Sequence, residues 1–285
     1  MIICEVSIDW LNVLLVIGIF SVIAVTLTAS ILIVSIVCKV NTDEKVASIL
    51  SNLAGANCGG CGCSGCEGFA KKLCSGDSTL SECHVTNDDN KQVIAKILGI
   101  DYEKGAPSVM VVKCNGGLNA CNSFRYDGIV DCDNETLLFG GAKVCKTGCL
   151  GSGSCVNACP EKAIHLKNHC AHVTPENCIS CGVCMTKCPK GLFERIPITA
   201  KVYIACSSHC KGKEVMNMCK NGCIGCGLCV KTCPEGAIKM ENGLPVIDHT
   251  HCTGCEKCIE ACPRNVINSR KNVFIKKRRR YTKKH

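Results

Sequence analysis

Cysteine, more than any other residue, limits what this chain can fold into. The 285 residues include 31 Cys but only 6 Phe, 4 Tyr and 1 Trp, so ordinary apolar packing cannot be the main source of stability. Three runs share the spacing C-x2-C-x2-C-x3-C-P, and they consist of Cys178, Cys181, Cys184 and Cys188, then Cys223, Cys226, Cys229 and Cys233, then Cys252, Cys255, Cys258 and Cys262. This spacing wraps a tight loop around one iron–sulfur cubane, while its fourth cysteine reaches a neighbouring cluster. Zinc sites gain nothing from the third close cysteine and the Cys-Pro, so the runs predict [4Fe-4S] clusters.

The runs belong to an internal duplication. A shift of 74 positions superposes eight cysteines of one copy on eight of the other without a gap, from Cys145 on Cys219 to Cys188 on Cys262. Each copy is doubled again at a shift of 29, which places Cys223 on Cys252. The sequence therefore predicts four cluster motifs in two modules.

One of the four motifs is irregular. Cys149, Cys155 and Cys159 keep their places, but Ser152 stands where the shift predicts a cysteine. Cys145, four residues before Cys149, is the candidate replacement. A [3Fe-4S] cluster, or a serine oxygen as ligand, is the alternative.

A different cysteine motif precedes the duplication. Its spacing is C-x2-C-x4-C-x16-C, and its members are Cys58, Cys61, Cys66 and Cys83. The glycines between them let the backbone bend close to a cluster and present N–H groups to its sulfides. Cys63 and Cys74 lie outside the spacing. Two amphipathic helices are expected to flank the motif, one capped by Asp43 and one ending at Gly99.

An apolar segment near the N-terminus predicts a membrane span. Leu11 to Val37 contains no charged residue and exceeds the ~20 residues that a spanning helix needs. The residues before it include acids but no Lys or Arg, which does not fit a cleaved signal peptide. Because Lys39 and Lys45 follow the segment, we expect the bulk of the chain in the cytosol, where thiols stay reduced.

The net charge of +9 is concentrated in the C-terminal tail, between Lys276 and Lys284. This tail either keeps the chain soluble, contacts anionic lipid, or captures an acidic redox partner. Nucleic acid is not an expected partner, because the basic tail is not accompanied by an aromatic-rich or helical surface that could recognise bases.

The duplicated motifs resemble bacterial two-cluster ferredoxins, and the resemblance implies exchanged fourth ligands. One cluster would take Cys262 beside Cys223, Cys226 and Cys229, and its neighbour would take Cys233 beside Cys252, Cys255 and Cys258. In the first copy, Cys159 would join Cys178, Cys181 and Cys184, leaving Cys188 for the irregular site with Cys149 and Cys155. About five [4Fe-4S] clusters are expected in all.

The order of the parts is similar to that in the B subunits of Rnf-type electron-transport complexes, in their long form. The C-x2-C-x4-C-x16-C motif resembles the cluster domain of that family, which is also found in corrinoid iron–sulfur proteins. The resemblance implies an α+β chain of small Fe–S modules, with a membrane anchor (1–40), a cluster domain (41–100), two ferredoxin-like modules (105–199 and 200–270) and a basic tail (271–285).

By the same resemblance, the chain is an electron-transfer subunit of an ion-translocating oxidoreductase, with no catalytic residue of its own. Implied partners are other subunits of the complex, membrane lipid, and a soluble ferredoxin or similar low-potential donor. The implied location is the bacterial inner membrane, single-pass. Alternatives are a polyferredoxin or an Fe–S redox sensor not coupled to ion transport. Six further cysteines either bind additional clusters or are buried structural thiols: Cys114, Cys121, Cys132, Cys206, Cys210 and Cys219.

Overall fold

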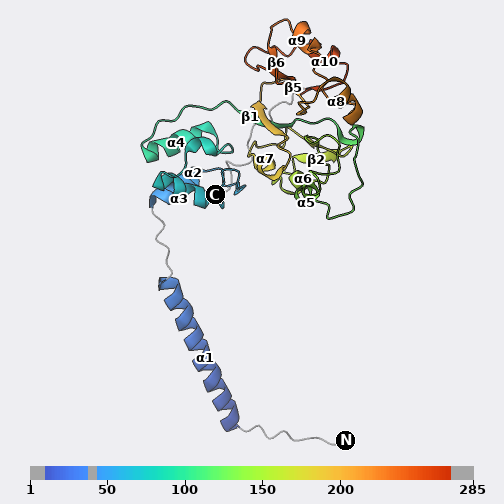
Figure 1. The fold of residues 1–285 in the computed structure, drawn as a ribbon. Coiled ribbons are helices and arrows are strands. Elements are labelled where there is room, and N and C mark those ends of the chain that lie inside the picture. Colours follow the sequence, from blue (N-terminus) through green and yellow to red (C-terminus); the bar gives the residue numbers. More distant parts are fainter. Residues whose placement is uncertain (1–9, 38–43, 271–285) are drawn as a thin grey trace, which may run out of the picture. The chain divides into compact units, whose positions relative to one another are not determined.

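The computed structural model describes residues 10–37 and 44–270. Asp43, Cys4, Cys38 and the basic tail lie outside the described residues. The chain divides into two compact units, one ending at Glu44 and one beginning at Lys45. Figure 1 shows the elements of both units along the chain.

The first unit contains the predicted apolar helix, α1 (Trp10–Val37). The hydroxyls of Ser21, Thr26 and Ser30 each donate to the backbone carbonyl four residues earlier, so these polar groups are satisfied within the helix itself. The stretch Leu14–Leu32 is long and apolar enough to cross a membrane.

The second unit begins with a small helical domain. Its elements are α2 (Glu44–Asn52), α3 (Cys66–Ser75), the 3-10 helix η1 (Leu80–Glu82) and α4 (Asp88–Leu98). They enclose a core that includes Ile49, Phe69 and Ile94. Gly99 ends α4 in the left-handed conformation, with φ 74°, as its position in the sequence predicts. This core fixes the ends of the loop that carries Cys58, Cys61 and Cys66.

The duplication predicted from the sequence is visible in the strands. The first copy contains β1 (Ser108–Val112), β2 (Ile164–Lys167), β3 (Cys170–Val173) and β4 (Phe193–Pro197), and the second contains β5 (Val202–Ile204), β6 (Ile238–Glu241), β7 (Leu244–Ile247) and β8 (Ile267–Ser269). In the first copy β1 pairs with β4 and β2 with β3, and in the second β5 pairs with β8 and β6 with β7, all antiparallel. Each module is thus closed by a strand from its beginning paired with one from its end.

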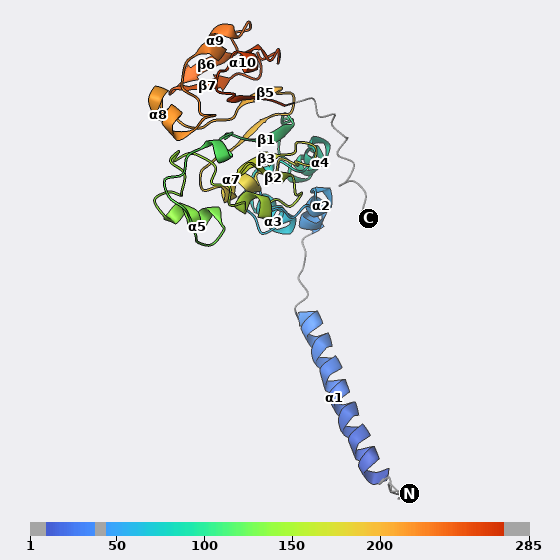
Figure 2. The ribbon, with the colours of Figure 1, turned by 90° about the vertical axis from the view of Figure 1, so that its right-hand side faces the viewer.

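Short helices join these strands. The first copy has η2 (Gly117–Asn119), α5 (Cys132–Leu137), α6 (Ser154–Asn157) and α7 (Val183–Lys187), and the second has α8 (Gly212–Met218), α9 (Leu228–Thr232) and α10 (Lys257–Glu260). Figure 1 shows α5, α6 and α7 in one group and α8, α9 and α10 in another, and α8, α9 and α10 again lie together in Figure 2. The two groups correspond to the two modules.

Candidate metal centres

All cysteines in the described ranges 10–37 and 44–270 are free thiols rather than disulfides. Many of them line small cavities, several to a cavity. No three His, Cys, Asp or Glu side chains among the described residues lie close enough to hold a single metal ion. Four cysteines around a cavity suit a cubane, because a cubane is wider than one ion and its ligands stand farther apart.

The second module shows the exchange of ligands most directly. A cavity of about 370 Å³ is lined by Cys223, Cys226, Cys229 and Cys262. Its other walls include the buried Pro245 and Ile267, whereas Leu228 and Cys226 are exposed. The Val266 N–H donates to Cys262 Sγ at 3.4 Å. The structure therefore brings a distant fourth cysteine to the first three, as expected from the ferredoxin resemblance.

The first module repeats this arrangement. A cavity of about 340 Å³ is lined by Cys159, Cys178, Cys181 and Cys184, and the Ala163 N–H donates to Cys159 Sγ at 3.3 Å. Burial raises the pKa of Cys184 to about 12, and the nearby thiols of Cys178 and Cys159 act in the same direction. Iron must displace those protons, so metal and proton compete for these sulfurs.

The other set of the second module is Cys233, Cys252, Cys255 and Cys258. Burial raises the pKa of Cys258 to about 11, and the adjacent thiols of Cys252 and Cys255 contribute. Cys233 and Cys252 pack against the same hydrophobic core as Cys258.

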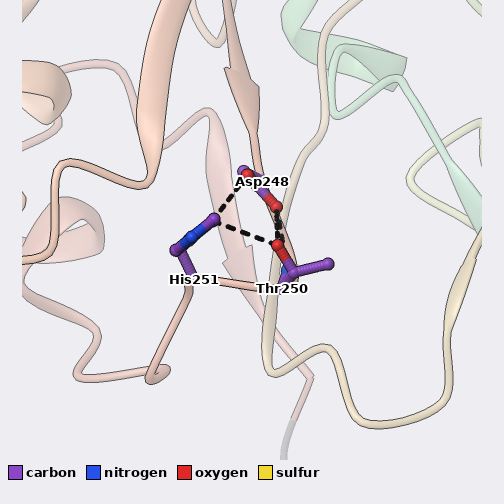
Figure 3. Close-up of polar contacts among 3 residues, drawn as sticks. All are labelled: Asp248, Thr250 and His251. Atoms are coloured by element: carbon purple, nitrogen blue, oxygen red, sulfur yellow. Dashed lines mark hydrogen bonds and ion pairs between the residues drawn. The ribbon is translucent and has the colours of Figure 1, made fainter.

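A polar turn leads into Cys252 (Figure 3). Asp248 accepts hydrogen bonds from the Thr250 N–H at 2.9 Å and the Thr250 hydroxyl at 2.6 Å. His251 Nδ1 lies 2.8 Å from the other carboxylate oxygen, and these contacts hold the pKa of Asp248 well below its usual range. The Asp248 carbonyl in turn accepts from the Cys252 N–H at 3.1 Å. The turn thereby fixes where this cysteine begins its loop.

The irregular site differs from the sequence-based assignment. A cavity of about 350 Å³ is lined by Cys132, Cys149, Cys155 and Cys188. Burial raises the pKa of Cys155 to about 12, with contributions from the thiols of the other three. Cys145 is not part of this wall and lines a separate cavity. The fourth thiol comes instead from Cys132, the first residue of α5.

Two serines hold α5 in this position. The Ser152 hydroxyl donates to the buried carboxylate of Glu135 in α5. Ser154 accepts from the Cys132 N–H at 2.7 Å and donates to Asp131, the N-cap of α5, at 2.6 Å. Ser152, which stands where the repeat predicts a cysteine, therefore helps to hold α5 in place. α5 in turn supplies Cys132, the cysteine that lines the site. One sequence feature indicates the extra segment that contains Cys132. The spacing between Cys114 and Cys145 is longer than the spacing between Cys206 and Cys219.

The first domain brings its four predicted cysteines together. A cavity of about 370 Å³ is lined by Cys58, Cys61, Cys66 and Cys83. Asn57 Oδ1 accepts from the Cys66 N–H at 2.8 Å, which orients the last turn of the loop. Cys63 is buried but does not line the cavity, and Cys74 is exposed, in agreement with their exclusion from the motif.

Cys181 connects this domain to the first module. It lines both the cavity of the first domain and that of the first module. A hydrogen bond from its thiol lowers the pKa of Cys58 to about 6. Arg195 Nη1 lies 2.7 Å from His84 Nε2, and Nη2 donates to the Ser180 carbonyl at 3.2 Å. The two sites are therefore immediate neighbours.

Comparison with known families agrees with this picture. Two families described as 4Fe-4S dicluster domains match residues 143–189 and 222–266. A family described as an Fe-S cluster matches residues 53–85. The predicted fold, a series of small mixed α/β cluster modules, and the predicted [4Fe-4S] cofactor are confirmed.

Three curated proteins are similar over most of the chain. The B subunit of the Na(+)-translocating ferredoxin:NAD(+) oxidoreductase complex of Acetobacterium woodii is 36% identical, over 84% of this chain and 73% of its own length. The B subunit of the proton-translocating ferredoxin:NAD(+) oxidoreductase complex of Clostridium ljungdahlii is 40% identical, over 70% and 71%. The B subunit of the ion-translocating oxidoreductase complex of Methanosarcina acetivorans is 34% identical, over 76% and 83%. The chain therefore belongs to the family of B subunits of Rnf-type ion-translocating oxidoreductase complexes, as an iron–sulfur subunit of such a complex.

Proposed function

We propose that this chain is a membrane-anchored carrier that passes single electrons from a low-potential donor, such as reduced ferredoxin, toward an NAD-reducing part of its complex. The names of the similar proteins supply the donor and acceptor classes. The observation that carries the proposal is the set of four-cysteine cavities along the chain, two of which share Cys181 in their walls.

Five ligand sets are proposed for [4Fe-4S] clusters. They are Cys58, Cys61, Cys66 and Cys83; Cys159, Cys178, Cys181 and Cys184; Cys132, Cys149, Cys155 and Cys188; Cys223, Cys226, Cys229 and Cys262; and Cys233, Cys252, Cys255 and Cys258. Cys132 takes the place given to Cys145 in the sequence-based assignment. With four thiolates at the third site, neither a [3Fe-4S] cluster nor a serine ligand is needed.

Each bound cluster supplies one-electron redox chemistry. The protein's part is to hold and shield it. Buried apolar residues such as Val266 and Ile267 line one site, and the backbone N–H groups of Ala163 and Val266 donate to ligand sulfurs. Hydrogen bonds to sulfur and exposure to solvent are what a protein uses to set cluster potentials. No side chain is required for acid–base chemistry.

Electron transfer is tested on the purified complex. Reduced ferredoxin should bleach the visible absorption of the clusters, and NAD(+) should restore it when the partner subunits are present. The chain alone should be bleached by ferredoxin but not reoxidised by NAD(+), because the NAD site belongs to another subunit. Reoxidation by NAD(+) without partners would contradict this division of roles. Ion uptake into vesicles distinguishes a coupled complex from a polyferredoxin or redox sensor.

The anchor and the domain boundaries are further parts of the proposal. α1 is proposed to cross the bacterial inner membrane once, with residues 39–285 on the cytoplasmic side and the basic tail near lipid or an acidic partner. Domain limits at 41–100, 105–199 and 200–270 are supported by the β1–β4 and β5–β8 pairs, which close each module from its two ends.

Removal of the anchor should release the chain from membranes. A chain beginning at Glu44 lacks all of α1, and burial of about 20 apolar residues is what holds a spanning helix in a bilayer. We expect it in the soluble fraction with an unchanged iron content, measured by fractionation and iron analysis. The matched control is the full chain, which should remain in the membrane fraction at high salt. If the shortened chain stays membrane-bound without its partners, the anchor lies elsewhere.

A further inference from the structure

Four cysteines outside the five proposed sets line one further cavity. Its volume is about 380 Å³, against 340–370 Å³ for the four cavities described above. Its cysteines are Cys114, Cys145, Cys206 and Cys219. Burial raises the pKa of Cys219, and the thiols of Cys114, Cys145 and Cys206 contribute, so all four sulfurs lie within electrostatic reach of one another.

The strand registers show that these cysteines are two equivalent pairs. Val112 in β1 pairs with Phe193, and Ile204 in β5 pairs with Ile267, which stands 74 positions after Phe193. Val112 and Ile204 therefore occupy the same place in their modules. Cys114 and Cys206 follow them by two residues each, and Cys145 and Cys219 are already matched by the duplication.

Equivalent backbone groups donate to equivalent sulfurs. The Cys149 N–H donates to Cys114 Sγ at 3.4 Å, and the Cys223 N–H donates to Cys206 Sγ at 3.5 Å. Cys149 and Cys223 are themselves related by 74 positions. The Gly116 N–H adds a second donor to Cys114 Sγ at 3.4 Å. Each sulfur thus receives a backbone N–H, and hydrogen bonds of this kind are made to the sulfur ligands of iron–sulfur clusters.

The modules also contact each other symmetrically around the cavity. The Asn221 amide donates to the Asn115 carbonyl at 3.0 Å, and the Ser207 hydroxyl donates to the Thr147 carbonyl at 3.1 Å. Asn221 corresponds to Thr147 and Asn115 to Ser207, so the two residue pairs are exchanged by a two-fold relation, as in an isologous interface, with the donor on the opposite member of the second pair.

Two glycines bring the backbone close to the sulfurs that line this cavity. A Cβ at Gly116 would lie 3.3 Å from Cys219 Sγ and 3.6 Å from Cys114 Sγ. A Cβ at Gly148 would lie 3.6 Å from Cys145 Sγ. Nearby, the buried ammonium of Lys143 donates to the carbonyls of Gly117 and Ala120. It places a positive charge beside a site that thiolates would make anionic.

We propose that Cys114, Cys145, Cys206 and Cys219 bind a sixth [4Fe-4S] cluster between the two ferredoxin-like modules. This inference rests on the proposed function, in which the chain carries clusters in series. Cys149 and Cys223, whose N–H groups reach the new site, are ligands of the adjacent sites in the first and second modules. The sixth cluster would therefore lie between those two sites.

Iron and acid-labile sulfide per chain test this proposal on the full protein purified without oxygen. The wild type should hold about 24 irons, because each cubane contributes about four. Cys145→Ala and Cys219→Ala should each lose about one iron and no sulfide, because a cubane held by three thiolates loses its unligated iron. The double variant leaves two thiolates and should lose the whole cluster, about four irons and four sulfides, rather than the about two irons that losses from two separate clusters would give. Cys121→Ala, at an exposed cysteine near the site, should lose none.

Two further measurements keep the test decisive. Size-exclusion chromatography and circular dichroism should show that the variants remain folded, and the two single variants probe the site from different modules. An unchanged iron content in both would overturn the sixth site while leaving five clusters, as would additive losses in the double variant or one bound zinc. If the wild-type protein contained neither iron nor sulfide, this result would instead contradict the proposed function itself.

Discussion

Replacing Cys132 by Ala should leave the irregular site with three thiolates, those of Cys149, Cys155 and Cys188. A cubane held by three thiolates readily loses its unligated iron, so about one iron per chain should be lost from that [4Fe-4S] site. The oxidised protein should show the EPR signal of a three-iron cluster, which the wild type lacks. Iron analysis and EPR of the full chain measure both changes.

The matched comparisons are Cys145→Ala and a rescued double variant. Cys145→Ala should lose iron from a different site, because Cys145 lines another cavity, so adding Ser152→Cys to it should not restore that iron. Adding Ser152→Cys to Cys132→Ala restores the regular spacing and should restore the lost iron. A three-iron signal from Cys145→Ala that Ser152→Cys removes, with none from Cys132→Ala, would return the ligand to the position expected from the sequence.

Replacing Gly60 by Ala should separate the first domain from the first module without emptying either site. A Cβ at Gly60 would lie only 2.1 Å from the Cys181 carbonyl oxygen. This neighbour is backbone, so it cannot move aside cheaply. Overpacking of this kind costs about 1–3 kcal/mol, which corresponds to a shift of about 5- to 150-fold in the equilibrium between the docked and separated states.

We therefore expect Gly60→Ala to keep the iron content of the wild type while electron transfer between Cys58's site and Cys181's site slows. Rapid-mixing reduction with ferredoxin, followed at visible wavelengths, would show the slow fraction. Gly105→Ala is the control, since its new methyl group meets nothing within 4 Å. Equal rates in both variants would mean that electrons do not pass through this contact.

The sequence predicted the parts of the fold that depend on local spacing. The runs around Cys178, Cys223 and Cys252 bring their first three thiols together through two-residue gaps alone, and the ferredoxin resemblance predicts the fourth. The helix ending at Gly99 was likewise readable from the local pattern. These features need no knowledge of how distant segments pack.

Other features depend on tertiary packing and could not be read in this way. Cys132 enters its site because α5 is held by Ser152 and Ser154, and neither contact follows from spacing. The equivalence of Cys114 and Cys206 was obscured by unequal spacing downstream, and only the pairing of β1 with β4 and of β5 with β8 establishes it. A comparison of the repeats at one fixed shift cannot identify a ligand that lies in an insertion, because the other copy has no matching residue.

The two-fold contact between the modules has a consequence for dissecting the protein. Cutting the chain near residue 200 would separate the two modules. Each piece would contain one module but only two of the four cysteines proposed for the site between them. A fragment holding only Cys206 and Cys219 could complete four thiolates by pairing with a second copy of itself. Such fragments would then report the stoichiometry of an artificial dimer, and the natural iron load can be counted only on an uncut chain.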